Sequence, residues 1–299
     1  MKILVTGADG FVGRHLCAYL RAQGDEVTEE RGPPGPMPFL DVADERAVRA
    51  SVQRAAPEGV IHLAGFSSVA ASHTSAAEAV RVNTLGTANL LTAVRDLAPK
   101  AKVVVVGSGE TYGALAKGAR AGEDMPLVPT SPYSSSKVAA EVLALQFHRS
   151  YGLHVICARP FNHLGRGQHR AFVVPSFAAQ LQAVKRGEAE PVIRVGNLEA
   201  IRDFSHVDDV VAAYRLLLER APAGATFNIC SGEPRSIRSL LDELIALAAV
   251  QVRVEVDQQR FRPADIPYLV GDPAKIERLG WKRAHTVRDA LQEVLDEHA

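Results

Sequence analysis

A tyrosine and a lysine four residues apart give the strongest chemical signal in this sequence. Tyr133 and Lys137 lie within Thr130-Ser-Pro-Tyr-Ser-Ser-Ser-Lys137. A helix over this stretch would bring the phenol and the ammonium onto one face, one turn apart. Ser131 and Pro132 are typical of a helix start. Such a pair also occurs on ordinary amphipathic helices, so its meaning depends on the rest of the chain.

The pair could exchange a proton with a carbonyl or alcohol oxygen. The pKa of a free tyrosine is about 10, so work near pH 7 requires a shift worth roughly 4 kcal/mol. An ammonium about 5 Å away supplies about 3 kcal/mol at an effective dielectric constant near 20. Ser108, expected at the end of a buried strand, could hydrogen-bond the same oxygen and orient it.

A glycine-rich turn near the N-terminus indicates the second reactant. The apolar run from Lys2 to Thr6 leads into Gly7-Ala-Asp-Gly-Phe-Val-Gly13 and then a helical pattern. Strand, glycine turn and helix form the context of a dinucleotide-binding fingerprint, here spaced GxxGxxG. Glycines permit close approach of a pyrophosphate, which the helix N-terminus binds. We expect hydride transfer to take place beside Tyr133 and Lys137, and the positive nicotinamide ring of an oxidised cofactor could supply the rest of the pKa shift of Tyr133. The expected cofactor contacts in this region are Gly7, Gly10, Phe11, Val12 and Gly13.

The end of the second expected strand, Asp25 to Glu30, bears on the choice of dinucleotide. Arg31 stands near the position where an acid would favour NAD, and it would suit the 2′-phosphate of NADP. Glu29 or Glu30 could instead bind the ribose of NAD. We favour NADP(H), with NAD(H) as the alternative. Asp41, ending a short strand expected at Phe39 to Val42, could bind the adenine amine or cap a helix from Ala43 to Ala55.

The order of elements predicts the fold. Apolar runs at Gly59–Leu63, Lys102–Val106 and Val155–Ala158 alternate with helical patterns, of which the longest runs from Glu78 to Leu97. This predicts an α/β Rossmann fold with a doubly wound parallel sheet, whose ligands bind beyond the carboxyl ends of the strands. Further cofactor contacts are expected from Val42, Leu63, Ala64, Gly65, Asn83 and Pro160.

A smaller α/β C-terminal lobe is expected to hold the substrate. Regularity falls after His163, and glycine and charge content rise in Gly165–Arg170. We expect a Rossmann domain of residues 1–164 plus 203–230, with Thr226–Ile229 returning to the main sheet. Residues 165–202 plus 231–299 would form the lobe.

Composition excludes several functional classes. Lys plus Arg and Asp plus Glu both number 34, so no overall field favours nucleic acid or a membrane. Cys17, Cys157 and Cys230 lack the spacing of a disulfide framework or a zinc site, and no metal site is expected. No apolar run approaches the roughly 20 residues that span a bilayer, and Met1 precedes no leader-like segment. We expect a cytoplasmic protein.

The glycine pattern, Ser108 and the Tyr133–Lys137 pair together resemble the extended short-chain dehydrogenase/reductases. Four strings narrow this to the branch of GDP-mannose 4,6-dehydratase and GDP-4-dehydro-6-deoxy-D-mannose reductase: Ile61-His-Leu-Ala-Gly65, Ser108-Gly-Glu-Thr-Tyr-Gly113, Ala158-Arg-Pro-Phe-Asn-His163 and Arg262-Pro-Ala-Asp265. The resemblance covers nearly the whole chain and implies a GDP-linked sugar as substrate. It implies a homodimer formed through the helices Glu78–Leu97 and Tyr133–Ser150. The implied substrate contacts are Ser67, Ser108, Asn162, Val174, Arg202, Arg262 and Asp265.

The reaction itself stays open. A reductase would need Tyr133 to protonate the oxygen at C4, giving GDP-D-rhamnose. A dehydratase would need an additional acid or base, and Glu110, two residues after Ser108, matches the dehydratase pattern. A 4-epimerase acting on another nucleotide sugar and a non-catalytic NADP-binding protein are the remaining alternatives.

Overall fold

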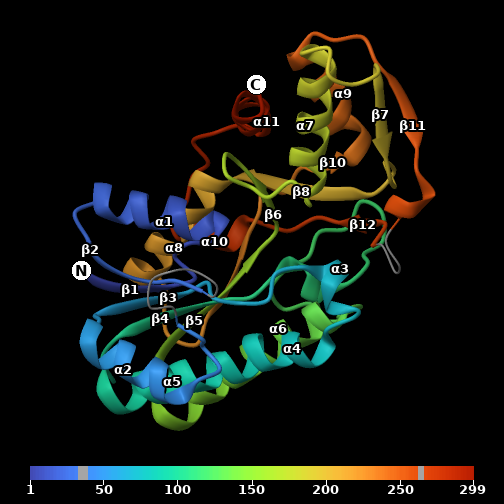
Figure 1. Cartoon of the computed structure of the whole chain (residues 1–299). Helices are drawn as coiled ribbons and strands as arrows, with labels where there is room; N and C mark the ends of the chain where they lie inside the picture. The colour runs from blue at the N-terminus through green and yellow to red at the C-terminus, as the bar shows by residue number, and fades with distance from the viewer. Residues whose placement is uncertain (33–39, 262–265) are drawn as a thin grey trace.

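The computed structural model describes residues 1–32, 40–261 and 266–299 (Figure 1). Its larger part is a six-stranded sheet in the order β2-β1-β3-β4-β5-β9, and every pairing is parallel. The strands are β1 (Lys2–Thr6), β2 (Glu26–Glu30), β3 (Gly59–His62), β4 (Lys102–Val106), β5 (His154–Pro160) and β9 (Thr226–Ile229). The strand order reverses between β1 and β3, where a crevice opens at the carboxyl ends. The predicted doubly wound sheet is confirmed.

Helices cover both faces of this sheet. One face packs against α1 (Phe11–Ala22) and α8 (Val207–Arg220), and the other against α2 (Glu45–Ala55), α5 (Gly86–Leu97) and α6 (Pro132–Tyr151) (Figure 1). The side chains of β1 alternate between the two faces of the sheet: Ile3 and Val5 pack in the core on the α1 side, and Leu4 packs in the core on the α2 side. Burial on both faces explains why these strands are continuous apolar runs.

The helix α6, which carries Tyr133 and Lys137, begins as the sequence predicts. The Ser131 hydroxyl accepts the N–H of Ser134, and the Ser134 hydroxyl accepts the N–H of Ser131, each over 3.1 Å. Pro132 occupies the first turn, where its missing N–H costs nothing. The reciprocal cap fixes the first turn of α6, which carries Tyr133.

The long helix expected from Glu78 to Leu97 is interrupted by a wider turn. It consists of α4 (Ala76–Val80), a π-helical turn over Arg81–Leu85 and α5. Asn83 lies in the π turn with its side chain buried. A single π-helical turn inside an α-helix often marks a functional site.

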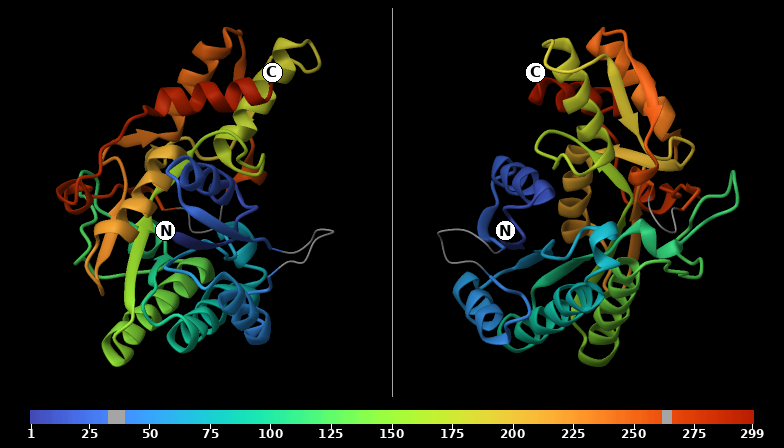
Figure 2. Two further views of the ribbon diagram at one scale, coloured as in Figure 1. Left: turned by 90° about the vertical axis from the view of Figure 1, so that its left-hand side faces the viewer. Right: turned by 45° about the vertical axis from the view of Figure 1, so that its right-hand side comes forward.

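A smaller lobe holds its own core between α7 (Val173–Lys185), α9 (Ile237–Ala248) and α11 (Val287–Glu297). In all three ribbon views these helices lie at the opposite end of the molecule from α2, α5 and α6 (Figures 1 and 2). Outside the six-stranded sheet, β6 (Asn162–Leu164), β8 (Ile201–His206), β10 (Pro234–Ser236) and β12 (Tyr268–Leu269) form a second sheet, β7 (Val192–Val195) pairs with β11 (Arg253–Val256), and a short helix η3 covers Gln258–Arg260. The α3 (Val69–Ser72), η2 (Gly109–Tyr112) and α10 (Ala274–Arg278) helices complete the chain. The domain boundaries stay a prediction.

One local prediction is wrong. Phe39 lies outside the described residues, and Leu40 to Val42 do not form a strand. Asp41 accepts the N–H of Ala43 in a turn, and Asp44 instead caps α2 by accepting the N–H groups of Arg46 and Ala47. The helix therefore starts two residues later than expected, because Asp44 is the acid that stands directly before it.

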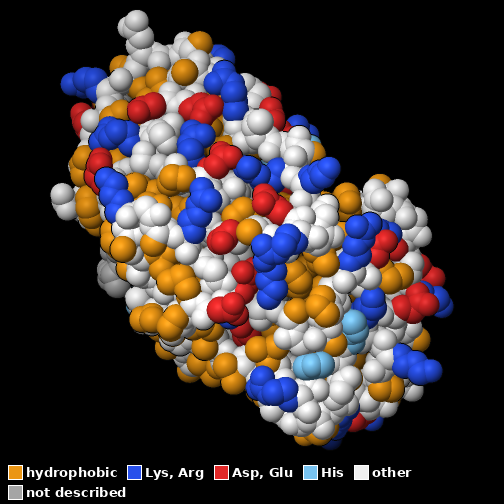
Figure 3. All heavy atoms as spheres, turned by 180° about the vertical axis from the view of Figure 1, so that it is seen from behind, with side chains coloured by type: hydrophobic (Ala, Val, Ile, Leu, Met, Phe, Trp, Pro, Cys, Tyr) orange, Lys and Arg blue, Asp and Glu red, His pale blue; other side chains and the backbone are white. Residues whose placement is uncertain are grey.

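Basic and acidic side chains are interspersed on the face opposite that of Figure 1 (Figure 3). No helix among the described residues combines the length and the apolarity needed to cross a bilayer.

Candidate active site

The glycine turn after β1 packs too tightly for side chains. Gly7 has φ +71°, and a Cβ there would lie 2.7 Å from the backbone nitrogen of Ala64. A Cβ on Gly13 would overlap the backbone of Gly7 and Ala8. The N-cap of α1 is Gly10, with no capping side chain and no acid in the first turn. These features leave the positive end of α1 open to an anion such as a pyrophosphate.

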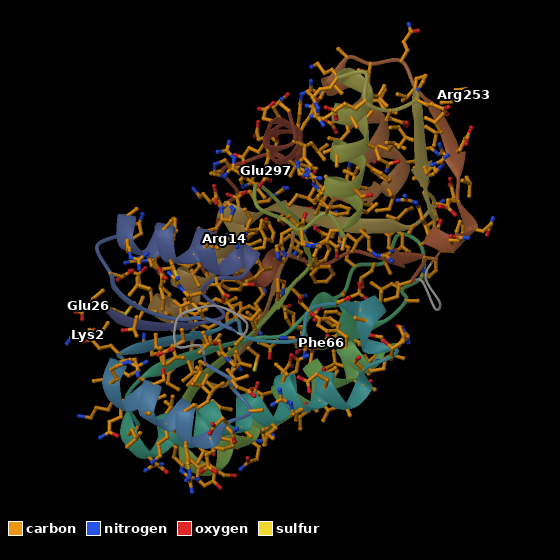
Figure 4. All side chains as sticks on the ribbon, in the orientation of Figure 1. Lys2, Arg14, Glu26, Phe66, Arg253 and Glu297 are labelled. Carbon is orange, nitrogen blue, oxygen red and sulfur yellow. The ribbon has the colours of Figure 1, made fainter. Side chains whose placement is uncertain are left out.

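A cavity of about 630 Å³ extends from this turn along the carboxyl ends of the strands. All of the expected cofactor contacts line it except Arg31 and Asn83. A second cavity, of about 470 Å³, enters the smaller lobe, and Glu110 and Asn162 line both. The two cavities therefore meet, as a site for two ligands requires. Phe66, a wall of the first cavity, is seen between the lobes in Figure 4.

The segment 165–170 joins the two lobes above the first cavity. The N–H of Gly167 donates to Glu297 of α11 over 2.7 Å, and its carbonyl accepts from Arg14 of α1 over 3.0 Å. Arg14 and Glu297 lie on facing sides of the two lobes in Figure 4. Gln168 of this segment lines the first cavity. The segment that bridges the two lobes therefore also forms part of the wall of the first cavity.

Ser108 and Tyr133 come together in the wall of the first cavity, near Glu110, which lines both cavities. Ser108 follows β4 and caps η2, since its hydroxyl accepts the N–H of Glu110 over 3.2 Å. The Ser108 side chain also hydrogen-bonds Tyr133, which lies in the first turn of α6. Two hydroxyls from separate elements are therefore close enough to bind one substrate oxygen.

Burial controls the protonation of Tyr133. It raises the pKa of the phenol to about 12, the Glu110 charge adds to the rise, and the Ser108 hydrogen bond opposes it. The expected downward shift caused by Lys137 is therefore absent in the protein alone. Tyr133 is protonated at neutral pH, which is the state that a proton donor needs.

Lys137 lies buried beneath the first cavity. Burial lowers the pKa of its ammonium to about 8, and Nζ donates to the carbonyl of Val106 over 2.9 Å. A Cβ on Gly65 would lie 3.2 Å from this Nζ and 2.8 Å from Oδ1 of Asn83. The space above Lys137 is thus available because residue 65 is glycine.

Asn83 supports the cavity wall from behind. Its Oδ1 accepts the N–H of Phe66 over 2.8 Å, and its Nδ2 donates to Oγ of Ser136 over 2.8 Å. Asn83 thereby ties the segment after β3 to α6. Direct contact between Asn83 and a cofactor stays a prediction.

At the adenosine end, both candidate acids are already paired. Glu30 is buried, accepts from Ser51 over 2.7 Å and pairs with Arg54. Glu29 pairs with Arg21 over 2.6 Å and with Arg31 over 3.2 Å. The Arg31 side chain is 57% exposed at the end of β2. The basic group is thus more accessible than either acid.

Asp41 is also engaged by a basic residue. It lines the first cavity and pairs with Nη1 of Arg81 over 2.9 Å. Burial alone would raise the pKa of Asp41, but the Ala43 N–H and the Arg81 guanidinium outweigh it and lower the pKa. The carboxylate is therefore ionised, as recognition of an amino group requires.

The expected substrate contacts divide between the two cavities. Ser67 and Val174 line the first cavity and Arg202 lines the second, while Arg262 and Asp265 lie outside the described residues. Sequence reasoning missed three further residues of the second cavity, His73, Arg194 and Arg260. They belong to three distant segments, so no local motif could have indicated them. Among the described residues, no group of three or more His, Cys, Asp or Glu is arranged to hold a metal ion.

Comparison with known proteins gives one consistent picture. The family model described as GDP-mannose 4,6 dehydratase matches residues 37–294. The chain is 36% identical to GDP-6-deoxy-D-mannose reductase of Pseudomonas aeruginosa, over 99% of this chain and 96% of that protein. It is 30% identical to GDP-6-deoxy-D-talose 4-dehydrogenase of Aggregatibacter actinomycetemcomitans, over 92% and 90%. The solved structure of RMD from Pseudomonas aeruginosa complexed with NADPH is similar, with a TM-score of 0.90, 34% identity and coverage of 100% and 99%.

Proposed function

Because the chain belongs to the GDP-mannose 4,6-dehydratase family of extended short-chain dehydrogenase/reductases, we propose that it reduces a GDP-linked sugar. The reaction is NADPH-dependent reduction of the C4 ketone of GDP-4-dehydro-6-deoxy-D-mannose to GDP-D-rhamnose. The reductase from Pseudomonas aeruginosa, similar over nearly its full length, supports this choice. The observation that carries it is the hydrogen bond of Ser108 to Tyr133 in the first cavity, close to Glu110, which also lines the second cavity.

The first cavity suits NADPH. Its glycine turn excludes side chains where a pyrophosphate would lie, and the first turn of α1 carries no acid. Arg31 would bind the 2′-phosphate, since it is the exposed basic group at the end of β2 and both Glu29 and Glu30 are already paired. Asp41 would contact the adenine amine. The relative with NADPH bound supports the same preference.

Each catalytic side chain then has a role. When bound in the first cavity, NADPH would supply the hydride for reduction at C4 of the sugar. Tyr133 donates its proton to the C4 oxygen, and Ser108 hydrogen-bonds this oxygen and orients the ketone. The Lys137 ammonium stabilises the phenolate that Tyr133 becomes, over a distance of about one helical turn. Asn162 and Arg202 would bind the nucleotide diphosphate in the second cavity.

The choice of substrate tests this proposal. Purified protein given GDP-4-dehydro-6-deoxy-D-mannose should oxidise NADPH in a one-to-one ratio and form GDP-D-rhamnose. Absorbance at the NADPH band and chromatography of the nucleotide sugar measure both quantities. Absence of NADPH oxidation with this sugar would reject the proposed reduction.

Dehydration of GDP-mannose is the second candidate, favoured by Glu110. This carboxylate lines both cavities two residues after Ser108, where it could take a proton from C5 of the sugar. Conversion of GDP-mannose to its 4-keto-6-deoxy form without net cofactor oxidation would establish dehydration. The Glu110→Gln variant should then lose this activity and retain reduction.

We also propose a homodimer that works in the cytoplasm. The exposed apolar residues on α4–α5 and α6 support the first point. Cys17, Cys157 and Cys230 are all free and buried, which fits a reducing compartment.

A further inference from the structure

A buried ion pair lies directly behind the candidate catalytic residues. Arg159 on β5 and Glu141 on α6 are 4% and 3% exposed. Nε of Arg159 donates to Oε2 of Glu141 over 2.9 Å, and Nη2 donates to Oε1. Desolvation makes such a pair expensive, and apolar residues of similar volume often give equal stability. Stability alone therefore does not account for this pair, and the other groups that bind Arg159 indicate a further role.

The Arg159 guanidinium also binds the turn that follows Ser108. Its Nη1 donates to the Tyr112 hydroxyl over 2.6 Å and to the carbonyl of Glu123 over 3.1 Å. Tyr112 is the last residue of η2, and its hydroxyl donates to Oδ1 of Asn228 on β9 over 2.8 Å. The η2 helix is thereby fastened to two strands of the sheet.

The same face of α6 carries both Lys137 and Glu141, one turn apart. Lys137 binds the carbonyl of Val106. A Cβ on the next residue, Gly107, would lie 3.6 Å from Oε2 of Glu141. Two successive turns of α6 therefore lie against the end of β4 immediately before Ser108, and the first of them is bonded to it through Lys137.

We propose that Arg159, Glu141 and Tyr112 are positioning residues for the reaction. They hold the Ser108 turn against α6, so that the hydroxyls of Ser108 and Tyr133 reach one substrate oxygen. None of the three lines either cavity, so they act through their neighbours and not on the substrate. Misplacement of reacting groups by about 1 Å costs up to roughly 100-fold in rate. This inference rests on the proposed reduction.

Tyr112→Phe gives the sharpest test, because it removes one hydroxyl and leaves the Arg159–Glu141 charges intact. The kcat for reduction should fall at least about tenfold, while KM for NADPH and for the sugar changes less than about twofold. With NADPH deuterated at the transferred hydrogen, the isotope effect on kcat should rise, because hydride transfer becomes slower relative to product release. Glu141→Gln, which keeps an acceptor for Arg159, should show the same changes.

Val52→Ala is the matched control, since Val52 is buried in α2 and lines neither cavity. It should lower the melting temperature and leave kcat and the isotope effect unchanged. If Tyr112→Phe keeps the wild-type kcat, or if Val52→Ala loses as much kcat at an equal fall in melting temperature, the positioning role is rejected.

A measurement without substrate separates this inference from the proposed function. Amide hydrogen exchange of residues 109–112 should be faster in Tyr112→Phe than in the wild type, and unchanged in Val52→Ala. Equal exchange in the wild type and Tyr112→Phe would overturn the positioning role whichever sugar the protein uses. If instead the wild type fails to oxidise NADPH with the sugar but the exchange difference appears, the proposed reduction is rejected and the structural link stands.

Discussion

Tyr133 is the residue on which the proposed reduction depends most directly. Tyr133→Phe removes the only proton that its side chain can give to the C4 oxygen. We expect kcat/KM to fall by about 100-fold or more, the size typical of losing a general acid. NADPH binding, followed by fluorescence titration, should change little. Full activity in the variant would assign the proton transfer to another group.

Arg31 determines the expected cofactor preference. Arg31→Ala should weaken NADPH by about 1.5–3 kcal/mol, the range for a hydrogen bond to a charged group, and NADH much less. Titration of both cofactors measures the difference. Arg21→Ala is the control, because Arg21 pairs with the same Glu29 but lies on α1 and not at the end of β2. Equal weakening of both cofactors by Arg31→Ala would remove the argument for NADP.

The buried Lys137 makes stability depend on pH. Burial lowers the pKa of its ammonium to about 8 in the folded state, whereas the unfolded lysine titrates near a pKa of about 10.4. Between these values the unfolded state binds more protons, so the contribution of Lys137 to stability rises with pH. Relative to Lys137→Met, the cofactor-free wild type should gain about 1–2 kcal/mol from pH 8 to 9.5, measured by urea unfolding. A pH-independent difference would contradict the lowered pKa.

Single residues also show how far sequence reasoning reaches. The Tyr-x-x-x-Lys spacing and the glycine turn led to the cavity because each depends on geometry within one element. The pairing of Glu30 with Arg54 and of Glu29 with Arg21 decides that Arg31 is the accessible group. Those contacts join α1 and α2 to β2, and no spacing along the chain reveals them. Asp41 failed as a cap because an acid three residues later competes for the same role.

At the level of elements, the capped start of α6 was predictable and the π turn was not. Ser131 and Pro132 carry local information, because a cap needs only neighbouring N–H groups. The π turn at Arg81–Leu85 coincides with the contacts of Asn83 to Phe66 and Ser136, which are tertiary. A helical pattern in the sequence does not indicate which distant residues Asn83 will bind, so it does not predict the π turn.

The α6 cap gives a prediction at this scale. Ser134→Ala removes the reciprocal half of the capping box and should cost about 1 kcal/mol of stability. It should also lower kcat several-fold, because the first turn of α6 holds Tyr133. Thr286→Ala weakens the corresponding capping box of α11, whose residues line neither cavity. Thermal unfolding should report similar losses for both, and only Ser134→Ala should lose kcat; equal kcat losses would argue against a link between the cap and the site.

At the level of the whole molecule, one surface carries several exposed apolar side chains. Val80 and Leu85 on the α4–α5 helix are 49% and 46% exposed, and Val142 on α6 is 56% exposed. These helices pack side by side at one end of the molecule (Figure 1). The opposite end carries the smaller lobe, so association through α4–α5 and α6 would leave both cavities open.

Charge placed on this surface tests the proposed dimer. The wild type should sediment at twice the chain mass, and Val142→Arg should shift it to the monomer, because burying an unpaired guanidinium at a two-fold contact costs several kcal/mol on each side. Val256→Arg is the matched control, since Val256 on β11 is 58% exposed at the other end of the molecule. It should leave the mass unchanged. If Val142→Arg stays dimeric, or the wild type is monomeric, association does not use α6.

Because Tyr133 and Lys137 lie on the same helix, a monomeric variant should also lose some kcat, as the contact would help to hold α6 in place.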